Sequence, residues 1–73
     1  MKNHIKELRK SVKLSQEELA KLCNVTRQTI NAIENDKYDP TLQLAFDIAF
    51  VLDTTVDDLF INESTRNDKI DLI

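Results

Sequence analysis

The sequence predicts an all-α domain of five short helices, and two observations carry that prediction. Apolar residues recur at the three- and four-residue spacing of one helix face. Residues that cap helix N-termini stand where these apolar runs begin, at Ser15, Thr26 and Thr41. The 73 residues suffice for one domain, and so short a chain buries only about 60% of its unfolded surface, which leaves the core marginal.

Each predicted helix has its own start or stop signal. Ser15 precedes Glu18 by three residues, which is the pattern of a capping box. Pro40 ends the third helix region, because proline disfavours helix at the residue before it. The predicted helices cover residues 2–12, 16–24, 26–34, 42–52 and 56–60. Their inward-facing residues are expected to be Ile5, Leu8, Val12, Leu19, Leu22, Cys23, Ile30, Ile33, Leu42, Ala45, Ile48, Ala49 and Leu52.

The turns between these helices must form without glycine, which the chain lacks. Asn24, Asp36 and Asp53 stand near helix ends, where a left-handed residue is useful. Asparagine and aspartate are the non-glycine residues that best tolerate that conformation. Lys13, before the second helix, is a less favourable substitute.

We expect the domain to span residues 1–61 and residues 62–73 to form a polar tail. The sequence from Ile61 onward is weakly patterned. A short strand near the termini, at the start of this tail, is left open.

The composition excludes several classes of protein. The one cysteine, Cys23, allows no internal disulfide and fits a reducing cytoplasm. With His4 as the one histidine, the usual Cys/His zinc site cannot be assembled. No apolar run approaches the roughly 20 residues that span a bilayer, and no glycine-rich phosphate loop occurs. We therefore expect a cytoplasmic protein that is not an enzyme, with no metal, cofactor or membrane contact.

The charge is unevenly distributed along the chain. The net charge is −3, but residues 1–37 hold eight Lys/Arg against five acids, and residues 38–73 hold two against eight. The first half thus carries +3 and the second −6. Because DNA responds to the field of the face it meets, this polarity is compatible with DNA binding without establishing it.

Residues 16–34 have the pattern of two helices joined by a short turn at a steep angle. Ala20 is small where the second helix crosses the first, and Asn24 makes the turn. The residues expected to hold the pair together are Leu19, Ala20, Cys23, Val25, Ile30 and Ile33. One side of the second helix is left free, with Arg27, Gln28, Asn31 and Asn35. Such side chains can contact base edges and phosphates.

The run LSQEELAKLCNVTRQTINAIENDKYDPTLQLAFDIAFVLDTTVDDLF resembles the lambda-repressor-like (Cro/CI-type) helix-turn-helix family. The resemblance covers about residues 2–61, and its segments SQEELA, VTRQTI and IENxKYxPTL are long and specific. Short stand-alone repressors of this family match the chain in size. The departures lie at turns, where Lys13, Asn24, Asp36 and Asp53 replace the family's usual glycines.

The resemblance implies a set of DNA contacts. Arg27 and Gln28 would enter the major groove, where arginine bonds guanine and glutamine bonds adenine. Gln16 and Thr26 would anchor phosphates, and Thr29 and Asn31 would make flanking contacts. The loop after the recognition helix would contact the phosphate backbone through Asn35, Lys37 and Tyr38. Lys2, Lys6 and Lys10 lie along one helix side and are weaker candidates.

Two further features are expected to be structural. By the same resemblance, Arg9 pairs with Glu34 and orients the recognition helix rather than binding DNA. The fourth helix is apolar nearly all round, so one small domain cannot easily cover it. We expect a two-fold dimer interface that includes Leu44, Phe46, Phe50 and Val51. The alternative is a wide core with an exposed aromatic residue.

The sequence thus predicts a transcriptional regulator, a repressor that binds a palindromic operator in double-stranded DNA as a homodimer. Two alternatives stay open. One is an antitoxin or restriction-system controller with the same fold. The other is a protein-interaction module that has lost DNA binding, which the acidic second half favours slightly.

Overall fold

Residues 1–61 are the part of the chain that the computed structural model describes, and they contain five α-helices. These are α1 (Ile5–Ser11), α2 (Gln16–Leu22), α3 (Arg27–Glu34), α4 (Leu42–Val51) and α5 (Val56–Leu59). The all-α prediction is confirmed for these residues. The predicted tail, 62–73, lies outside the described residues. No helix in the described range is long and apolar enough to cross a membrane.

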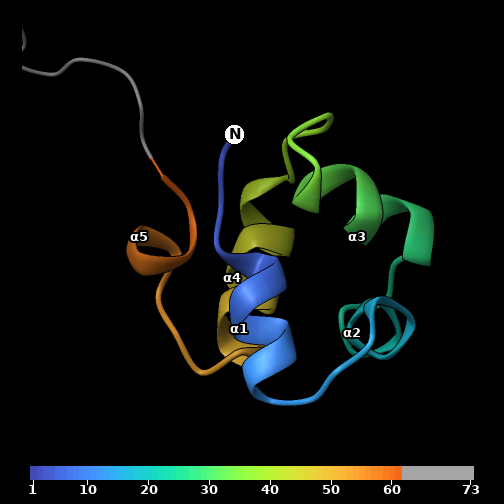
Figure 1. Ribbon diagram of the computed structural model, residues 1–73. Helices are drawn as coiled ribbons and strands as arrows, with labels where there is room; N and C mark the ends of the chain where they lie inside the picture. The colour runs from blue at the N-terminus through green and yellow to red at the C-terminus, as the bar shows by residue number, and fades with distance from the viewer. Residues whose placement is uncertain (62–73) are drawn as a thin grey trace, which may run out of the picture.

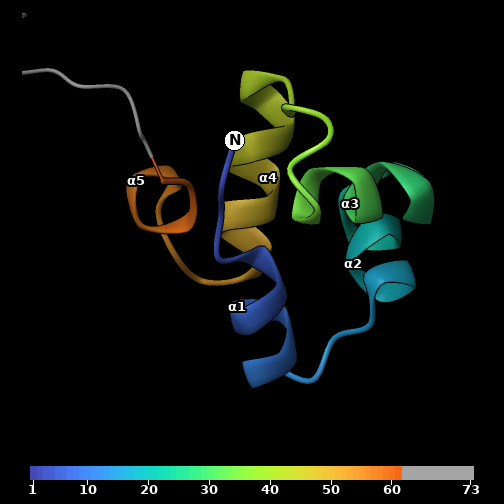
Figure 2. The ribbon, with the colours of Figure 1, turned by 45° about the horizontal axis from the view of Figure 1, so that its top comes forward.

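The helices share one core, and α4 lies in the middle of it. In Figures 1 and 2, α5 lies on one side of α4, and the α2–α3 pair lies on the other. Every helix contributes at least one large side chain that is fully buried: Ile5, Leu19, Ile30, Ile33, Ile48 and Leu59. Burial of each such side chain contributes roughly 1.5–3 kcal/mol, so packing around α4 holds these short helices in place.

Four of the helices begin at a hydroxyl cap. Ser15, Thr26, Thr41 and Thr55 each accept a hydrogen bond from the backbone N–H three residues on. Each cap satisfies an N–H group that the helix itself cannot pair. The caps expected at Ser15, Thr26 and Thr41 are therefore confirmed.

The same turn ends the first four helices. Lys13, Asn24, Asp36 and Asp53 have φ of 61°, 58°, 60° and 56°, which confirms the prediction of left-handed residues at these positions. The next N–H in each case bonds a carbonyl five residues back, at 2.9–3.0 Å: Leu14 to Arg9, Val25 to Ala20, Lys37 to Ala32 and Thr54 to Ala49. This is the Schellman arrangement, which satisfies the last carbonyls of a helix.

The first helix begins three residues later than predicted because residues 2–4 are paired elsewhere. Ile61 N–H donates to the Lys2 carbonyl and His4 N–H to the Leu59 carbonyl, both at 2.8 Å. Asn3 and Phe60 form an isolated antiparallel bridge. The sequence left undecided whether a short strand forms near the termini. Within residues 1–61, this single bridge is what forms there.

Three residues expected in the core are exposed. Val12 follows the last residue of α1 and is 47% exposed. Leu22 is 61% exposed. The buried face of α2 is formed by Leu19, Ala20 and Cys23, and Leu22 points about a quarter-turn or more away from the centre of that face. Leu42 is 70% exposed because the packed face of α4 is turned toward Leu44.

Candidate nucleic-acid interface

The start of α2 is fixed by a complete capping box. The Glu18 N–H donates to Ser15 Oγ at 3.0 Å, and the Ser15 N–H donates to the Glu18 carboxylate at 2.8 Å. The hydrogen bond from the Ser15 backbone is the main cause that lowers the pKa of Glu18 below its usual range. A charged Glu18 therefore stabilises the entry to the helix pair at neutral pH.

A short turn sets the angle between α2 and α3. Asn24 is left-handed, and the Val25 N–H bonds the Ala20 carbonyl at 2.9 Å. Ala20 is 2% exposed, so its small side chain lets the two helices cross closely. Thr26 then caps α3 by accepting the Thr29 N–H at 3.3 Å, and the two threonine hydroxyls lie 3.0 Å apart.

The α3 helix separates a core face from a solvent face. Ile30 and Ile33 are fully buried, whereas the residues on the opposite side are exposed: Arg27, Gln28, Asn31 and Asn35. Within residues 1–61, the side chains of Arg27 and Gln28 make no hydrogen bond or ion pair with the protein. A guanidinium and a carboxamide at the start of α3 are therefore available to an external ligand.

The loop after α3 lies beside this face. Tyr38 is 50% exposed and lines a shallow depression together with Gln28, Thr29 and Ala32. Lys37 is exposed one residue earlier. The depression therefore places Tyr38 of the loop close to Gln28 and Thr29 of α3, which are also predicted to bind DNA.

The amino group of Met1 binds the same loop. It forms ion pairs with Asp36 and with Asp39, the latter at 2.6 Å. The hydrogen bond to Asp36 is the main cause that raises the pKa of the amine. This contact partly offsets two negative charges near Lys37.

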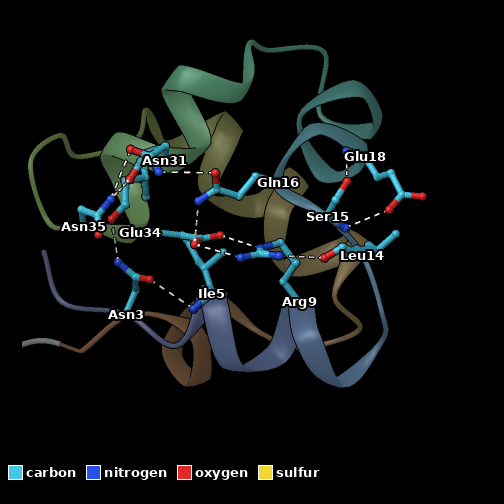
Figure 3. Close-up of polar contacts among 11 residues, drawn as sticks. Asn3, Ile5, Arg9, Leu14, Ser15, Gln16, Glu18, Asn31, Glu34 and Asn35 are labelled. Carbon is cyan, nitrogen blue, oxygen red and sulfur yellow. Dashed lines mark hydrogen bonds and ion pairs between the residues drawn. The ribbon is translucent and has the colours of Figure 1, made fainter.

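The end of α3 is joined to α1 by a buried ion pair. Arg9 Nε donates to Glu34 Oε2 at 2.7 Å and Arg9 Nη2 to Oε1 at 3.2 Å, and the two side chains are 10% and 3% exposed. Arg9 Nη1 also donates to the Leu14 carbonyl at 2.8 Å (Figure 3). The geometry matches the expected Arg9–Glu34 pair.

The side-chain amides beside this pair form a connected network. Gln16 Nε2 donates to Glu34 Oε1 at 3.1 Å, and Asn31 Nδ2 donates to Gln16 Oε1 at 3.3 Å. Asn35 Nδ2 donates to the Asn31 carbonyl at 2.9 Å and to Asn31 Oδ1 at 3.2 Å. Figure 3 shows these groups running from α1 to the outer side of α3. Gln16, expected to be a phosphate anchor, is thus also bonded within the protein.

Sequence reasoning missed Asn3. Its Nδ2 donates to the Ile33 carbonyl at 2.8 Å, and its Oδ1 accepts from the Ile5 N–H at 3.1 Å. The side chain therefore bridges the start of α1 and the end of α3. An asparagine two residues before the first buried apolar residue was the available signal.

The candidate dimer surface on α4 is partly as expected. Phe46 and Phe50 are 55% and 84% exposed, and Val51 is half-buried. Leu44 lies in the core of the single chain at 8% exposure, which removes it from the expected interface. Leu42, expected in the core, lies four residues before Phe46 and extends the exposed stripe.

Comparison with known proteins places this geometry among DNA-binding folds. The helix-turn-helix family model matches residues 5–59. An uncharacterised helix-turn-helix-type transcriptional regulator of Methanocaldococcus jannaschii is 52% identical over 63 residues, covering 86% of this chain and 96% of that protein. The restriction-modification controller protein C.AhdI from Aeromonas hydrophila superposes with a TM-score of 0.73 at 32% identity, over 78% of this chain and 86% of that one. The N-terminal DNA-binding domain of SinR from Bacillus subtilis gives 0.73 at 28% identity, over 85% and 91%.

Proposed function

The chain belongs to the Cro/CI-type helix-turn-helix family of transcriptional regulators, which are not enzymes, and on that premise we propose that it is a repressor that binds a palindromic operator as a homodimer. Such a protein acts in the cytoplasm, where the buried thiol of Cys23 stays reduced. Two steps carry the proposal: one chain reads a half-site, and a second copy supplies the other half.

The exposed start of α3 is the observation that carries the first step. Arg27 and Gln28 are held on a capped helix but bond nothing in the described part of the protein. Arginine pairs with guanine O6 and N7, and glutamine pairs with adenine N6 and N7. Because each side chain would exchange water for base-edge hydrogen bonds, these two residues would choose the sequence.

The residues around α3 would set register through the phosphate backbone. Thr26, beside the Thr29 hydroxyl, lies at the N-terminus of α3, where the helix dipole attracts an anion. Gln16 would contact a phosphate, and Thr29 and Asn31 would make flanking contacts next to the bases that Arg27 and Gln28 read. Asn35, Lys37 and Tyr38 would contact the backbone from the loop. Contacts of this kind supply most of the affinity and carry no sequence information.

The exposed stripe on α4 supports the second step. Leu42, Phe46 and Phe50 recur every four residues and are all more than half exposed. Asp47 is the one charged residue on this helix, so a partner would cover the stripe by apolar contact rather than by ion pairs. A second copy presents the same stripe, and two-fold pairing would bury both. The two α3 helices of such a dimer would enter successive major grooves about 34 Å apart.

A restriction-system controller is the second candidate function, and the structural likeness to C.AhdI is the observation that supports it. It shares the DNA-reading face and the dimer with the repressor proposal and differs in the genes controlled. A protein-interaction module differs more, because its binding would not depend on phosphates.

Salt dependence tests DNA binding against the interaction module. We expect the affinity for a selected duplex to fall at least about 1000-fold between about 50 and 200 mM salt, as for six phosphate contacts. Lys37→Ala should make this dependence shallower by about one contact per chain. An affinity that does not change with salt contradicts the proposal.

A further inference from the structure

We propose that Glu34 is a positioning residue for DNA recognition, because it fixes the direction in which the Gln16 and Asn31 amides form hydrogen bonds. Both amides then present N–H donors to DNA. The inference rests on the proposed function and adds to it a role for a buried carboxylate that contacts no DNA itself.

The direction begins at the carboxylate. Glu34 is paired with Arg9, and an ionised carboxylate only accepts hydrogen bonds. Oε2 accepts from Arg9 Nε, and Oε1 accepts from Arg9 Nη2 and from Gln16 Nε2. At 3% side-chain exposure, Glu34 has little contact with water, so these donors are what satisfies it.

Glu34 therefore determines which way the Gln16 amide points. A glutamine amide has a donor side and an acceptor side of nearly the same shape, and its partners decide between them. Since Glu34 accepts, the NH₂ group of Gln16 must face it at 3.1 Å. Its Oε1 then faces α3, where it accepts from Asn31 Nδ2 at 3.3 Å.

The same direction continues along α3. Because Asn31 gives its NH₂ to Gln16, its Oδ1 faces Asn35, whose Nδ2 donates to it at 3.2 Å. Asn35 is held a second time by the Asn31 carbonyl at 2.9 Å. Figure 3 shows the successive donors and acceptors from Asn35 to Arg9. Hydrogen bonds aligned in one direction polarise and strengthen one another.

DNA would bind the amide N–H groups that are not used in this series of internal hydrogen bonds. Each NH₂ group carries two hydrogens, so Gln16 and Asn31 each keep one N–H after their internal bond. A phosphate oxygen accepts such a donor from Gln16. For Asn31, the matching base edge is an acceptor such as purine N7 or guanine O6, rather than an amino group.

The first test removes the carboxylate without leaving a buried charge. Arg9→Met/Glu34→Met replaces the pair by apolar side chains of similar length, a change that folded proteins often tolerate. The base pair read by Asn31 is identified as the one whose preference Asn31→Ala abolishes. In the double variant, with its fold checked by circular dichroism, we expect preference at that base pair to fall about tenfold, within the range of one mismatched pair.

A second variant keeps the Arg9–Glu34 ion pair and interrupts the series of hydrogen bonds between Gln16 and Asn31. Gln16→Lys retains a donor toward Glu34 and toward phosphate but has no acceptor for Asn31. We expect preference at the Asn31 base pair, measured as the ratio of affinities for two duplexes that differ at that pair alone, to fall about tenfold. Gln43→Lys is the matched control, because Gln43 also donates to a carboxylate, Asp47, at 2.9 Å, but lies on α4. It should leave that preference unchanged.

The outcomes separate the inference from the proposed function. If the wild-type chain selects no DNA site, the proposed function fails and the inference falls with it. If the wild type selects a site, and Gln16→Lys or the folded double variant keeps the wild-type preference at the Asn31 base pair, the inference alone is overturned. Should the double variant not fold, Gln16→Lys decides.

Discussion

The Glu34 carboxylate accepts two hydrogen bonds from one side of the Arg9 guanidinium, from Nε at 2.7 Å and from Nη2 at 3.2 Å. This pair joins the last residue of α3 to α1. Both side chains are at least nine-tenths buried. Glu34→Ala leaves the arginine buried without its partner, so we expect the free energy of unfolding to fall by about 3–5 kcal/mol. Urea denaturation measures it. Arg9→Met/Glu34→Met should lose much less, and equal losses would show that the pairing itself is not what the single variant breaks.

Replacing the least suitable turn residue should stabilise the protein. Lys13 is left-handed at φ 61°, which is unfavourable for a side chain with a Cβ. We expect Lys13→Gly to raise the free energy of unfolding by about 0.5–1 kcal/mol. Asn24→Gly should gain less, because asparagine already tolerates this conformation. A loss at both positions in urea denaturation contradicts the assignment of strain to these turns.

The capping box predicts a pH dependence. The pKa of Glu18 is lowered in the folded protein, chiefly by the Ser15 N–H, from an ordinary value of 4.5. Its stabilising contribution is therefore present above pH 4.5 and is lost as the pH falls through the lower, folded-state pKa. The difference in unfolding free energy between wild type and Glu18→Ala should shrink over that range. A difference that stays constant from pH 7 to pH 3 rules out this contribution of Glu18.

The α4 stripe predicts a homodimer that one charge disrupts. Phe50 is 84% exposed on α4, and placing a carboxylate there opposes burial against a second copy. We expect wild type to sediment as a dimer and Phe50→Glu as a monomer. Leu22→Glu is the matched control, since Leu22 is 61% exposed on α2, and it should remain dimeric. Equal masses for wild type and Phe50→Glu remove Phe50 from the interface.

The assignment of base reading to Arg27 predicts a local loss of specificity. Arg27→Ala should weaken operator binding by about 1–3 kcal/mol and relax the preference at one base pair. Competition binding with single-base variants of the operator measures both effects. Lys21→Ala, a change of the same charge in α2, is the control. Unchanged binding by Arg27→Ala would mean that another face contacts the bases.

Much of this fold follows from local signals in the sequence. The caps at Ser15 and Thr26 depend on residues within three positions. The left-handed turns at Asn24 and Asp53 are closed by hydrogen bonds that span five residues. The predictions that were wrong concern features that depend on contacts between residues far apart in the sequence. The start of α1 is set by pairing with residues 59–61, and the rotation of α4 decides whether Leu42 or Leu44 is buried.

The candidate site divides in the same way. The spacing of Ile30 and Ile33 was enough to place Arg27 and Gln28 on the outer face of α3. The network of Gln16, Asn31 and Asn35 was not visible in the sequence, because it joins the first residue of α2 to α3 through the direction of each amide.

Selection of bound duplexes from random DNA tests the central claim most directly. The wild-type chain should enrich a palindrome whose half-sites lie about 10 base pairs apart, centre to centre, as two α3 helices in successive major grooves require. Arg27→Ala, selected in parallel, should lose the preference at one position of each half-site. No enrichment at about 50 mM salt, where phosphate contacts are strongest, would contradict DNA binding by this face. Enrichment of a site without two-fold symmetry would contradict the homodimer.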